Sequence, residues 1–506
     1  MDRRHFLKLS SIGLGGIGLT SCWNINTARK KIEINFPIHV RSNMATGHKI
    51  MKAISIPSTS TIQTETLIVG GGIAGFAAAN SIKNQDFILT EMDDDYGGTS
   101  GVTKIGGKQF SQGAHYDLSY PENYGKNGIQ LLENLNILEF HNSKNQYTFS
   151  DKQYLISDEH QEICYTNKGF QEAPIKAGPN KKDFIDLIKP YVGEMKMPTR
   201  LIKEKYRRFN NISFYDFIDK YLMHDSDLIT GIDYQMIDDY GSNCSNISAL
   251  AGIHYYACRD YFGDNKPDLF SPPEGNYYFI KKLYKNLNRQ QLKASSIAFH
   301  IEKKNNLYHS KLFNTKTEKV ETIISKNIVY AGQKNALKFI YPKYYSIFAS
   351  NQYTSWVAIN FDLKKTIPGQ QKWQNDMLGV HPNLMGFVNS ETQNSESKVL
   401  TMYMCFDPSE RKKMPKILAN PKAIVEEGVS FLNEYFQANC QEFINSAHIK
   451  VMGHAMPIPK KGYLFNDRNE QTKKDNFLFA GVDNGRLPLM FEALDSGILA
   501  ANLINN

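Results

Sequence analysis

The sequence predicts an α/β protein in which a Rossmann-type dinucleotide-binding domain is interrupted by a second, α+β domain. A β-branched run at residues 66–69 enters a glycine-rich turn and is followed by an alanine-rich helical segment. A second hydrophobic run at residues 87–90 ends in an acidic residue. Beyond residue 120, strand-like and helix-like segments alternate without an internal repeat. We therefore expect the second domain to be inserted into the first in pieces.

The glycine turn has the G-x-G-x-x-G spacing of a dinucleotide site, with Gly70, Gly72 and Gly75 at the glycine positions. Gly70 allows the tight turn, Gly72 lets the backbone approach the phosphates, and Gly75 lets the helix pack closely on the strand. The phosphates would face free N–H groups at a helix N-terminus, where the helix dipole favours negative charge. The same spacing alone is also found in ordinary loops, so the flanking elements decide the interpretation.

Glu91 supplies the second half of this fingerprint. It follows the strand at residues 87–90 and lies 21 positions after Gly70 (91 − 70 = 21). A carboxylate roughly 20 positions after the first glycine is typical of ribose recognition. Together with both flanking elements, it predicts a dinucleotide site.

The N-terminus resembles a bacterial export signal, which we expect to cover residues 1–21. Arg3 and Arg4 precede Phe-Leu-Lys and a glycine-rich apolar run at residues 12–19, as in a twin-arginine signal. That run is shorter than the about 20 apolar residues of a spanning helix. The Leu-Thr-Ser-Cys that ends at Cys22 resembles a lipobox, which predicts lipidation there and a place on the periplasmic face of a bacterial membrane. The alternative is an ordinary signal with an incidental cysteine.

This predicted location bears on the cofactor. The twin-arginine route carries folded proteins, typically those already loaded with cofactor. Soluble nicotinamide has no obvious supply outside the cytoplasmic membrane. The signal and the glycine motif together therefore favour a tightly held FAD over NAD.

Composition narrows the class of protein. The chain of 506 residues is long enough for two or three domains, and its 41% hydrophobic and 22% charged residues are ordinary for a globular protein. The net charge of +8 is modest, and the basic run at residues 200–208 favours a solvated helix face over a nucleic-acid patch. Attraction to anionic membrane lipid stays open. The six cysteines are scattered without metal-ligand spacing, so we expect no disulfide scaffold and no structural metal.

Local patterns place further elements along the chain. Amphipathic helices are predicted at residues 183–188, 215–222 and 426–436, and strands at residues 296–302 and 320–330. The expected order is a signal at residues 1–21, a tether with an irregular lead-in at 22–63, the dinucleotide-binding domain at 64–145, 231–335 and 451–506, and the second domain at 146–230 and 336–450.

These motifs resemble the flavin-containing amine oxidase superfamily, which includes monoamine and polyamine oxidases, protoporphyrinogen oxidase and phytoene desaturase. After Glu91 comes a double glycine, Gly97 and Gly98, which in that family lies against the flavin. Residues 476–483 resemble the family's aromatic strand with Ala-Gly-acid, and residues 492–501 resemble its Ser-Gly and closing helix. The resemblance covers most of the chain from residue 64. It implies a discontinuous FAD-binding domain with an inserted α+β substrate domain.

The resemblance also implies where FAD would be held. Residues 105–116 are similar to the hairpin that passes close to the isoalloxazine ring, and residues 295–302 to the strand whose backbone meets the adenine. Thr99 and Ser100 stand where many relatives carry an arginine near the flavin and phosphates. No residue at 480–497 suits a covalent flavin link, so non-covalent FAD is expected. The cofactor-binding residues implied in this way are Gly70, Gly72, Ile73, Ala74, Gly75, Glu91, Gly97, Gly98, Thr99, Gly113, Ala114, Ala298, Gly481 and Asp483.

Candidate catalytic side chains are those expected beside the ring, because in flavin enzymes the protein mainly orients the substrate and excludes water. His115 and Tyr116 belong to the hairpin, and His454 precedes the C-terminal motif, where relatives line the substrate cavity. Either histidine is a candidate to accept a proton; each can equally be an ordinary hydrogen-bonded residue. Aromatic side chains such as those of the tyrosine-rich residues 254–262 belong to a hydrophobic core more often than they line a pocket. The lone Cys258 has no identifiable activating partner.

The leading hypothesis is an exported, lipid-anchored, FAD-dependent oxidoreductase of amine-oxidase type. It would transfer a hydride from an amine or another small organic substrate to flavin N5, with oxygen or a membrane quinone as electron acceptor. The alternatives are a desaturase- or protoporphyrinogen-oxidase-like enzyme for a bulky apolar substrate, and a non-catalytic flavoprotein that acts as a surface binding partner. A nicotinamide-dependent enzyme is disfavoured by the compartment and by the C-terminal motif, and no nucleic-acid partner is expected.

Overall fold

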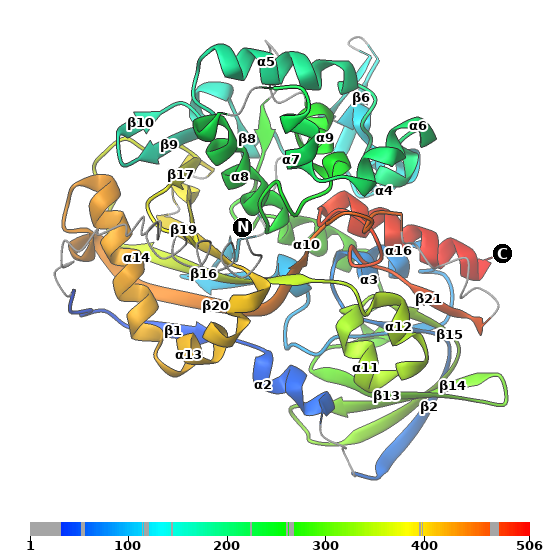
Figure 1. Cartoon of the computed structure of the whole chain (residues 1–506). Helices are drawn as coiled ribbons and strands as arrows, with labels where there is room; N and C mark the ends of the chain where they lie inside the picture. The colour runs from blue at the N-terminus through cyan, green and yellow to red at the C-terminus, as the bar shows by residue number, and fades with distance from the viewer. Residues whose placement is uncertain are drawn as a thin grey trace, which may run out of the picture.

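The structure is a computed structural model of the whole chain. It describes residues 32–51, 56–113, 115, 121–142, 145–222, 225–259, 262, 268–393, 396, 398–465 and 475–505. Two large sheets organise the described residues, and helices cover them (Figure 1). No helix in these ranges combines the length and the apolar character that crossing a membrane requires.

The first sheet carries the glycine turn. Its strand order is β12–β3–β2–β15–β14–β13, and β21 pairs with the C-terminal end of β15. The strands β12, β3, β2, β15 and β21 are parallel to one another, whereas β13, β14 and β15 are antiparallel. The bounds are β2 Ser58–Val69, β3 Phe87–Thr90, β12 Leu292–Lys293, β13 Ser296–Lys304, β14 Leu307–Asn314, β15 Val320–Tyr330 and β21 Phe477–Phe479. One sheet is thus assembled from three separate parts of the chain.

Both faces of this sheet are covered, as is usual for parallel strands. Along β2, Ile68 packs toward α3 Ile73–Ser81 and α16 Met490–Asn505. The alternate residue Leu67 packs toward α11 Leu337–Ile340 and α12 Tyr345–Phe348 on the other face. In Figure 1, α16 and α3 lie side by side. A Cβ on Gly497 would lie 2.1 Å from the carbonyl oxygen of Ala74, so glycine is what allows these two helices to approach.

The second sheet has the order β1–β20–β16–β19–β18–β17–β9–β10. Helix α14 Pro421–Phe436 packs on one face, against Val357, Ile359 and Phe361 of β16. The alternate residues Trp356 and Ala358 therefore face the other way, toward the rest of the molecule. The bounds are β1 Ile38–Arg41, β9 Glu162–Thr166, β10 Gly169–Gln171, β16 Tyr353–Leu363, β17 Gln374–Leu378, β18 Leu384–Asn389, β19 Val399–Phe406 and β20 Ile444–Pro457.

A helical region stands above both sheets in Figure 1. Its core is aromatic: the rings of Phe184 and Tyr256 lie 4.9 Å apart, and Phe214 packs against both. Serine and aspartate begin its helices, since Asp225 accepts hydrogen bonds from the first turn of α8 and Ser248 from that of α9. Its helices are α4 Lys126–Asn134, α5 Pro179–Ile188, α6 Glu204–Arg207, α7 Phe214–Asp219, α8 Ser226–Tyr240 and α9 Ala249–Cys258, with α10 Tyr277–Lys285 leading back to the first sheet.

Several local predictions are confirmed. The strand predicted at residues 320–330 is β15, and the one at 296–302 lies within β13. The three amphipathic helices correspond to α5, α7 and α14.

One local prediction is wrong, and another holds only in part. The lead-in predicted as irregular contains β1, which pairs in parallel with β20, and its residues 58–63 are the exposed start of β2. Alternating Ser, Thr and Ile suit a half-exposed strand there, and the polar composition concealed it. In the basic run, only Glu204–Arg207 is α-helical, between 3-10 turns. Lys203 and Lys205 are exposed as expected, but Arg200 binds a buried aspartate.

Candidate functional site

The glycine turn forms a cradle at the start of α3. Gly70 has φ +109°, and a Cβ on Gly75 would lie 1.9 Å from the carbonyl oxygen of Gly70, so both positions require glycine. Gly72 is different: a Cβ there would meet nothing closer than 3.9 Å. Within the described part of the chain, no group accepts a hydrogen bond from the amides of Gly72, Ile73 or Ala74. Unpartnered amides at a helix N-terminus, bordered by open space, fit a phosphate group.

The double glycine lies against this turn, and its predicted contact with a flavin stays a prediction. The Gly97 amide donates to the carbonyl oxygen of Gly71 over 2.9 Å. A Cβ on Gly98 would lie 3.5 Å from the Cα of Gly72. Both glycines have positive φ, +132° and +57°, and Thr99 follows in the short 3-10 helix Gly98–Ser100. Two segments that are separate in the sequence therefore form one cradle.

Glu91 orders the glycine turn. Its Oε2 accepts a hydrogen bond from the Gly71 amide over 2.8 Å, and its Oε1 accepts one from the Asp93 amide over 2.9 Å. Burial raises the pKa of the Glu91 carboxyl to about 7. The side chain thus lies beside the cradle where a ribose carboxylate is expected, and contact with a ribose stays a prediction.

The C-terminal motif reaches the same region. Gly481 has φ +119°, and its amide donates to Ser496 Oγ over 3.1 Å. Asp483 is buried and already accepts three hydrogen bonds: from the Lys334 amide at 2.7 Å, from Lys334 Nζ at 2.9 Å and from the Tyr353 hydroxyl at 3.0 Å. The structure therefore shows Asp483 joining three segments of the fold. Its predicted contact with a flavin stays a prediction.

Ala298 lies on β13 with its side chain in the core between this sheet and α11. The start of β13 is close to Glu91, because the Ser296 amide donates to the Glu91 carbonyl oxygen over 2.7 Å. The Ala298 side chain is thus occupied in the core, and the predicted contact of this strand's backbone with an adenine stays a prediction. Ala114, Tyr116 and Cys22 lie outside the described residues.

His115 packs against two aromatic side chains of the second domain. Its ring centroid lies 5.5 Å from that of Trp373 and 5.3 Å from that of Tyr403. Burial lowers the pKa of His115 to about 4, so the ring is neutral at pH 7. Buried His115 Nδ1 and the buried Tyr403 hydroxyl have no hydrogen-bond partner in the described structure. Buried polar atoms of this kind usually have a hydrogen-bond partner.

Acidic side chains lie near Tyr403. Asp376 on β17 accepts a hydrogen bond from the Tyr234 hydroxyl over 3.1 Å, and burial raises its pKa to about 7. Burial, with help from Asp376, raises the pKa of Asp238 well above its usual value. Asp238 itself is half-buried. We refer to His115, Trp373, Tyr403, Asp238 and Asp376 as the chamber.

His454 lies elsewhere, in a bulge of β20 where the pairing with β16 is interrupted. Its ring lies 5.7 Å from that of Tyr353, which in turn binds Asp483. Burial, with the charge of Arg411, lowers the pKa of His454 to about 4. The two predicted catalytic histidines therefore contact different aromatic side chains. Tyr255, Tyr256 and Cys258 of α9 are core residues.

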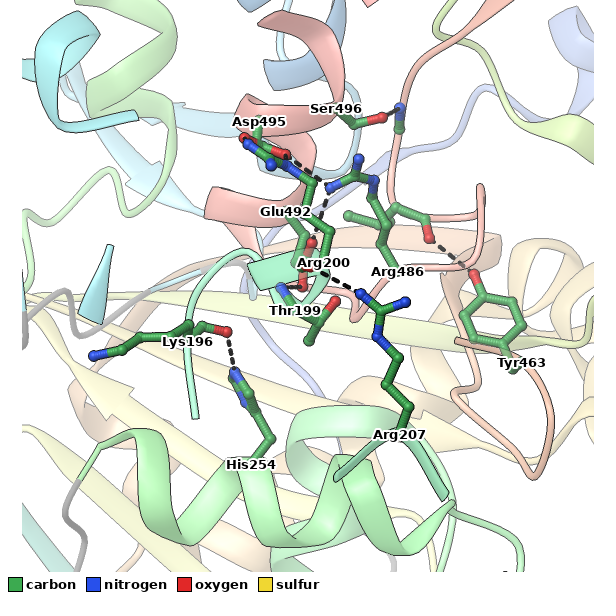
Figure 2. A network of polar contacts seen from close by, with 12 residues as sticks. Lys196, Thr199, Arg200, Arg207, His254, Tyr463, Arg486, Glu492, Asp495 and Ser496 are labelled. Carbon is green, nitrogen blue, oxygen red and sulfur yellow. Dashed lines mark hydrogen bonds and ion pairs between the residues drawn. The ribbon is translucent and has the colours of Figure 1, made fainter. Parts of the chain in front are cut away.

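A buried ion network, shown in Figure 2, holds the N-terminal end of α16. Arg486 Nη1 lies 3.3 Å from Glu492 and 3.0 Å from Asp495. Arg200 binds both oxygens of Asp495, at 2.7 and 2.8 Å, and the Thr199 amide donates to Glu492 over 2.7 Å. The network joins the helical region to the helix that packs on α3. It steadies the wall of the cradle.

Comparison with known proteins bears on the fold. No protein-family model and no curated protein matches the sequence. Among solved structures, putrescine oxidase bound to putrescine has a TM-score of 0.57 at 13% identity, over 88% of this chain and 100% of that one. A provisionally named protoporphyrinogen oxidase from Exiguobacterium sp. 255-15 has a TM-score of 0.59 at 13% identity, over 88% and 98%. Cyclohexylamine oxidase from Brevibacterium oxydans IH-35A has 0.58 at 12%, over 87% and 98%.

This chain has the two-domain fold of these oxidases. The similarity extends over nearly the whole length of each of them, so it includes both sheets and the helical region. The predicted α/β fold class, with a discontinuous Rossmann-type domain and an inserted α+β domain, is confirmed. At this identity the likeness is one of fold, and the chemistry has to be argued from the residues.

Proposed function

We propose that the protein is a FAD-dependent oxidoreductase that oxidises a small organic amine, with non-covalently bound FAD. The observation that carries the proposal is the cradle: unpartnered amides at Gly72, Ile73 and Ala74 face open space beside the double glycine. That arrangement fits a diphosphate, and Glu91 lies beside the position expected for the adjoining ribose. A bound flavin would supply a two-electron acceptor for a hydride.

The chamber favours an amine over a bulky apolar substrate. The aromatic rings of Trp373 and Tyr403, buried beside His115, are of the kind that attracts a cation, and Asp238 and Asp376 are carboxyl groups near Tyr403. An apolar substrate would offer no hydrogen bond or charge to the Asp238 carboxyl group, which costs free energy. Asp376 already accepts hydrogen bonds from the Tyr234 hydroxyl and from Gln374 Nε2. A cationic substrate would instead favour the charged forms of both carboxyl groups. Amine recognition therefore uses groups that an apolar ligand would only bury.

The residues of the chain have distinct roles in this proposal. The aromatic faces orient the substrate, and Asp238 and Asp376 attract its positive charge. Neutral His115 has a buried, unpartnered Nδ1 that can accept a proton from the substrate nitrogen. His454 is separated from the chamber's aromatic pair, so we assign it to the support of Tyr353 and Asp483.

The location and the electron acceptor belong to the same proposal. We infer export by the twin-arginine route, lipidation at Cys22 and reoxidation by oxygen or a membrane quinone. The support is the sequence: Arg3 and Arg4, the apolar run at 12–19 and the lipobox-like residues 19–22. Replacing Arg3 and Arg4 with lysines should leave the precursor in the cytoplasm, and unchanged export would contradict the inferred route.

The test of the activity is anaerobic mixing of the flavin-loaded protein with primary amines, diamines and matched neutral alcohols. We expect amines to bleach the flavin absorption, and Asp238→Asn to slow bleaching by amines at least about tenfold. The neutral alcohols serve as the control for charge recognition. Bleaching by alcohols and amines alike, unaffected by Asp238→Asn, would contradict amine recognition by the chamber.

A further inference from the structure

A groove on the surface of the helical region combines apolar and basic side chains. It lies between the 3-10 turn Arg208–Asn211 and α7 with the two residues that follow it, and its volume is about 400 Å³. The side chains that line it are Arg208, Phe209, Ile212, Phe217, Lys220 and Tyr221. The cradle and the chamber contribute none of these residues, so the groove is a separate feature of the molecule.

The apolar side chains of the groove form an aromatic base with an exposed edge. The rings of Phe209 and Phe217 are buried, with centroids 5.5 Å apart. The Tyr221 ring lies 5.6 Å from that of Phe217, yet Tyr221 is 57% exposed and Ile212 is 39% exposed. Single exposed apolar residues need no explanation, but exposed apolar residues gathered in one groove are typical of an interaction site.

The two cations of the groove are available for a ligand. Arg208 and Lys220 are exposed, and within the described ranges their side chains form no ion pair and no hydrogen bond. Their contacts are instead with neighbouring rings: the Arg208 guanidinium lies 5.1 Å from the centroid of Phe209, and the Lys220 ammonium lies 5.3 Å from that of Tyr221. Positive charge is thus held beside the aromatic base.

The nearby carboxylates are occupied by other groups. Residues 189–222, which contain the groove, hold four carboxylates, and each has a partner: Glu194 binds Lys203, Glu204 binds Arg207, Asp216 binds Ser213, and Asp219 binds Tyr215. None of these four carboxylates lines the groove. Its lining therefore carries two positive charges and no negative charge, which fits an anionic ligand.

We propose that the groove binds an anionic phospholipid at a membrane surface. The apolar part of the lipid packs on the aromatic base, and Arg208 and Lys220 bind its phosphate. Tyr221 at the edge suits the headgroup level, where an amphipathic ring is favourable. A neutral apolar ligand would leave both cations unused, and a small inorganic anion would leave the aromatic base unused. The inference goes beyond the proposed oxidation of an amine and does not depend on bound FAD.

Two points favour a membrane lipid over a second copy of the chain as the occupant. Two copies that paired through the same groove would bring the like charges of Arg208 and Lys220 together, because such an interface uses the same surface on both subunits. The lipid anchor that we infer at Cys22 from the sequence would hold the protein at a membrane surface. A bilayer with anionic headgroups would thus be both near and complementary in charge.

The experiment measures partition of the full chain into vesicles of phosphatidylglycerol and of phosphatidylcholine by sedimentation. Every protein carries Cys22→Ser, so that an attached lipid cannot contribute. We expect stronger partition into phosphatidylglycerol. Arg208→Gln together with Lys220→Gln should weaken it about twentyfold, because each basic residue near an anionic surface contributes about fivefold. The matched control is Lys416→Gln with Lys422→Gln, which removes the same charge from exposed lysines of α13 Met414–Ala419 and α14. It should weaken partition no more than about twofold.

The apolar contact has a control of its own. Tyr221→Ser should weaken partition about threefold to tenfold, because it removes an aromatic ring that the bilayer buries in part. Phe339→Ser removes a ring that is 38% exposed on α11 and should change partition little. All the replaced side chains of the described residues are exposed, so the melting temperatures should match that of the wild type.

Equal partition into the two kinds of vesicle would overturn the inference, as would equal losses in the groove pair and the control pair. Self-association of the chain that Tyr221→Ser abolishes, without binding to either kind of vesicle, would also overturn it in favour of a second copy in the groove. None of these results depends on flavin binding, so the inference stands or fails independently of the proposed function.

Discussion

Substitutions at Gly72 and Gly75 distinguish the cofactor-binding role of the glycine turn from its structural role. A Cβ on Gly75 would lie 1.9 Å from the Gly70 carbonyl oxygen, so Gly75→Ala must push the helix and the turn apart. Overpacking of this kind costs about 1–3 kcal/mol of unfolding free energy, or more. A Cβ on Gly72 meets only the Gly97 carbonyl oxygen, at 3.9 Å, and the φ of Gly72 is −86°, which any residue adopts. Gly72→Ala should therefore cost no more than about 1 kcal/mol, the usual cost of alanine at a helix N-cap.

The effect on FAD affinity should have the opposite order: substitution of Gly72 should weaken FAD binding although it costs little stability. Side chains at position 72 project into the open space beside the unpartnered amides, where the phosphates are expected. Gly72→Ala should weaken FAD binding at least about tenfold, equivalent to about 1.4 kcal/mol, and Gly72→Val should weaken it further. Melting curves of the FAD-free variants give the stability, and titration with FAD gives the affinity. Full FAD affinity in a well-folded Gly72→Val protein would refute the placement of the cofactor.

Three further outcomes are expected. Burial raises the pKa of Asp376 to about 7, so the folded state holds a proton that the unfolded chain releases near pH 4. The unfolding free energy should therefore fall as pH rises from about 4 to 7. Urea titration at several pH values should show a smaller fall in Asp376→Asn than in the wild type. Glu492→Gln leaves Arg486 and the Thr199 amide with a weaker partner in a buried site. It should lower the unfolding free energy by about 3–5 kcal/mol. A loss below about 1 kcal/mol would show that the network is dispensable. His115→Asn should slow flavin reduction by substrate in stopped-flow measurements at least about tenfold with FAD retained, and His454→Asn should change it little; the reverse order would exchange the roles assigned to the two histidines.

The sequence predicted the parts of the fold that follow from local chemistry. Gly70 and Gly72 lie between a strand and a helix, Gly75 lies in the first turn of that helix, and Glu91 lies beside the turn. Each of these positions is determined by a few neighbouring residues. The distant Gly497 was also predictable by resemblance, and its close approach to Ala74 explains why a glycine stands there.

The chamber could not be predicted, because its residues come together only in the folded chain. Asp238 belongs to α8, Asp376 to β17 and Tyr403 to β19, and no spacing in the sequence links them. The contact of Asp483 with a flavin stays a prediction, and its partners Lys334 and Tyr353 come from segments that the motif does not include.

The most direct test of the central claim is the visible absorption spectrum of the purified, folded protein before and after desalting. The account predicts a flavin spectrum that survives desalting and is released by denaturation, as expected for tightly but non-covalently bound FAD. A folded, colourless protein that binds no added FAD would contradict the account at its foundation, because the cradle at Gly72 would then serve some other purpose.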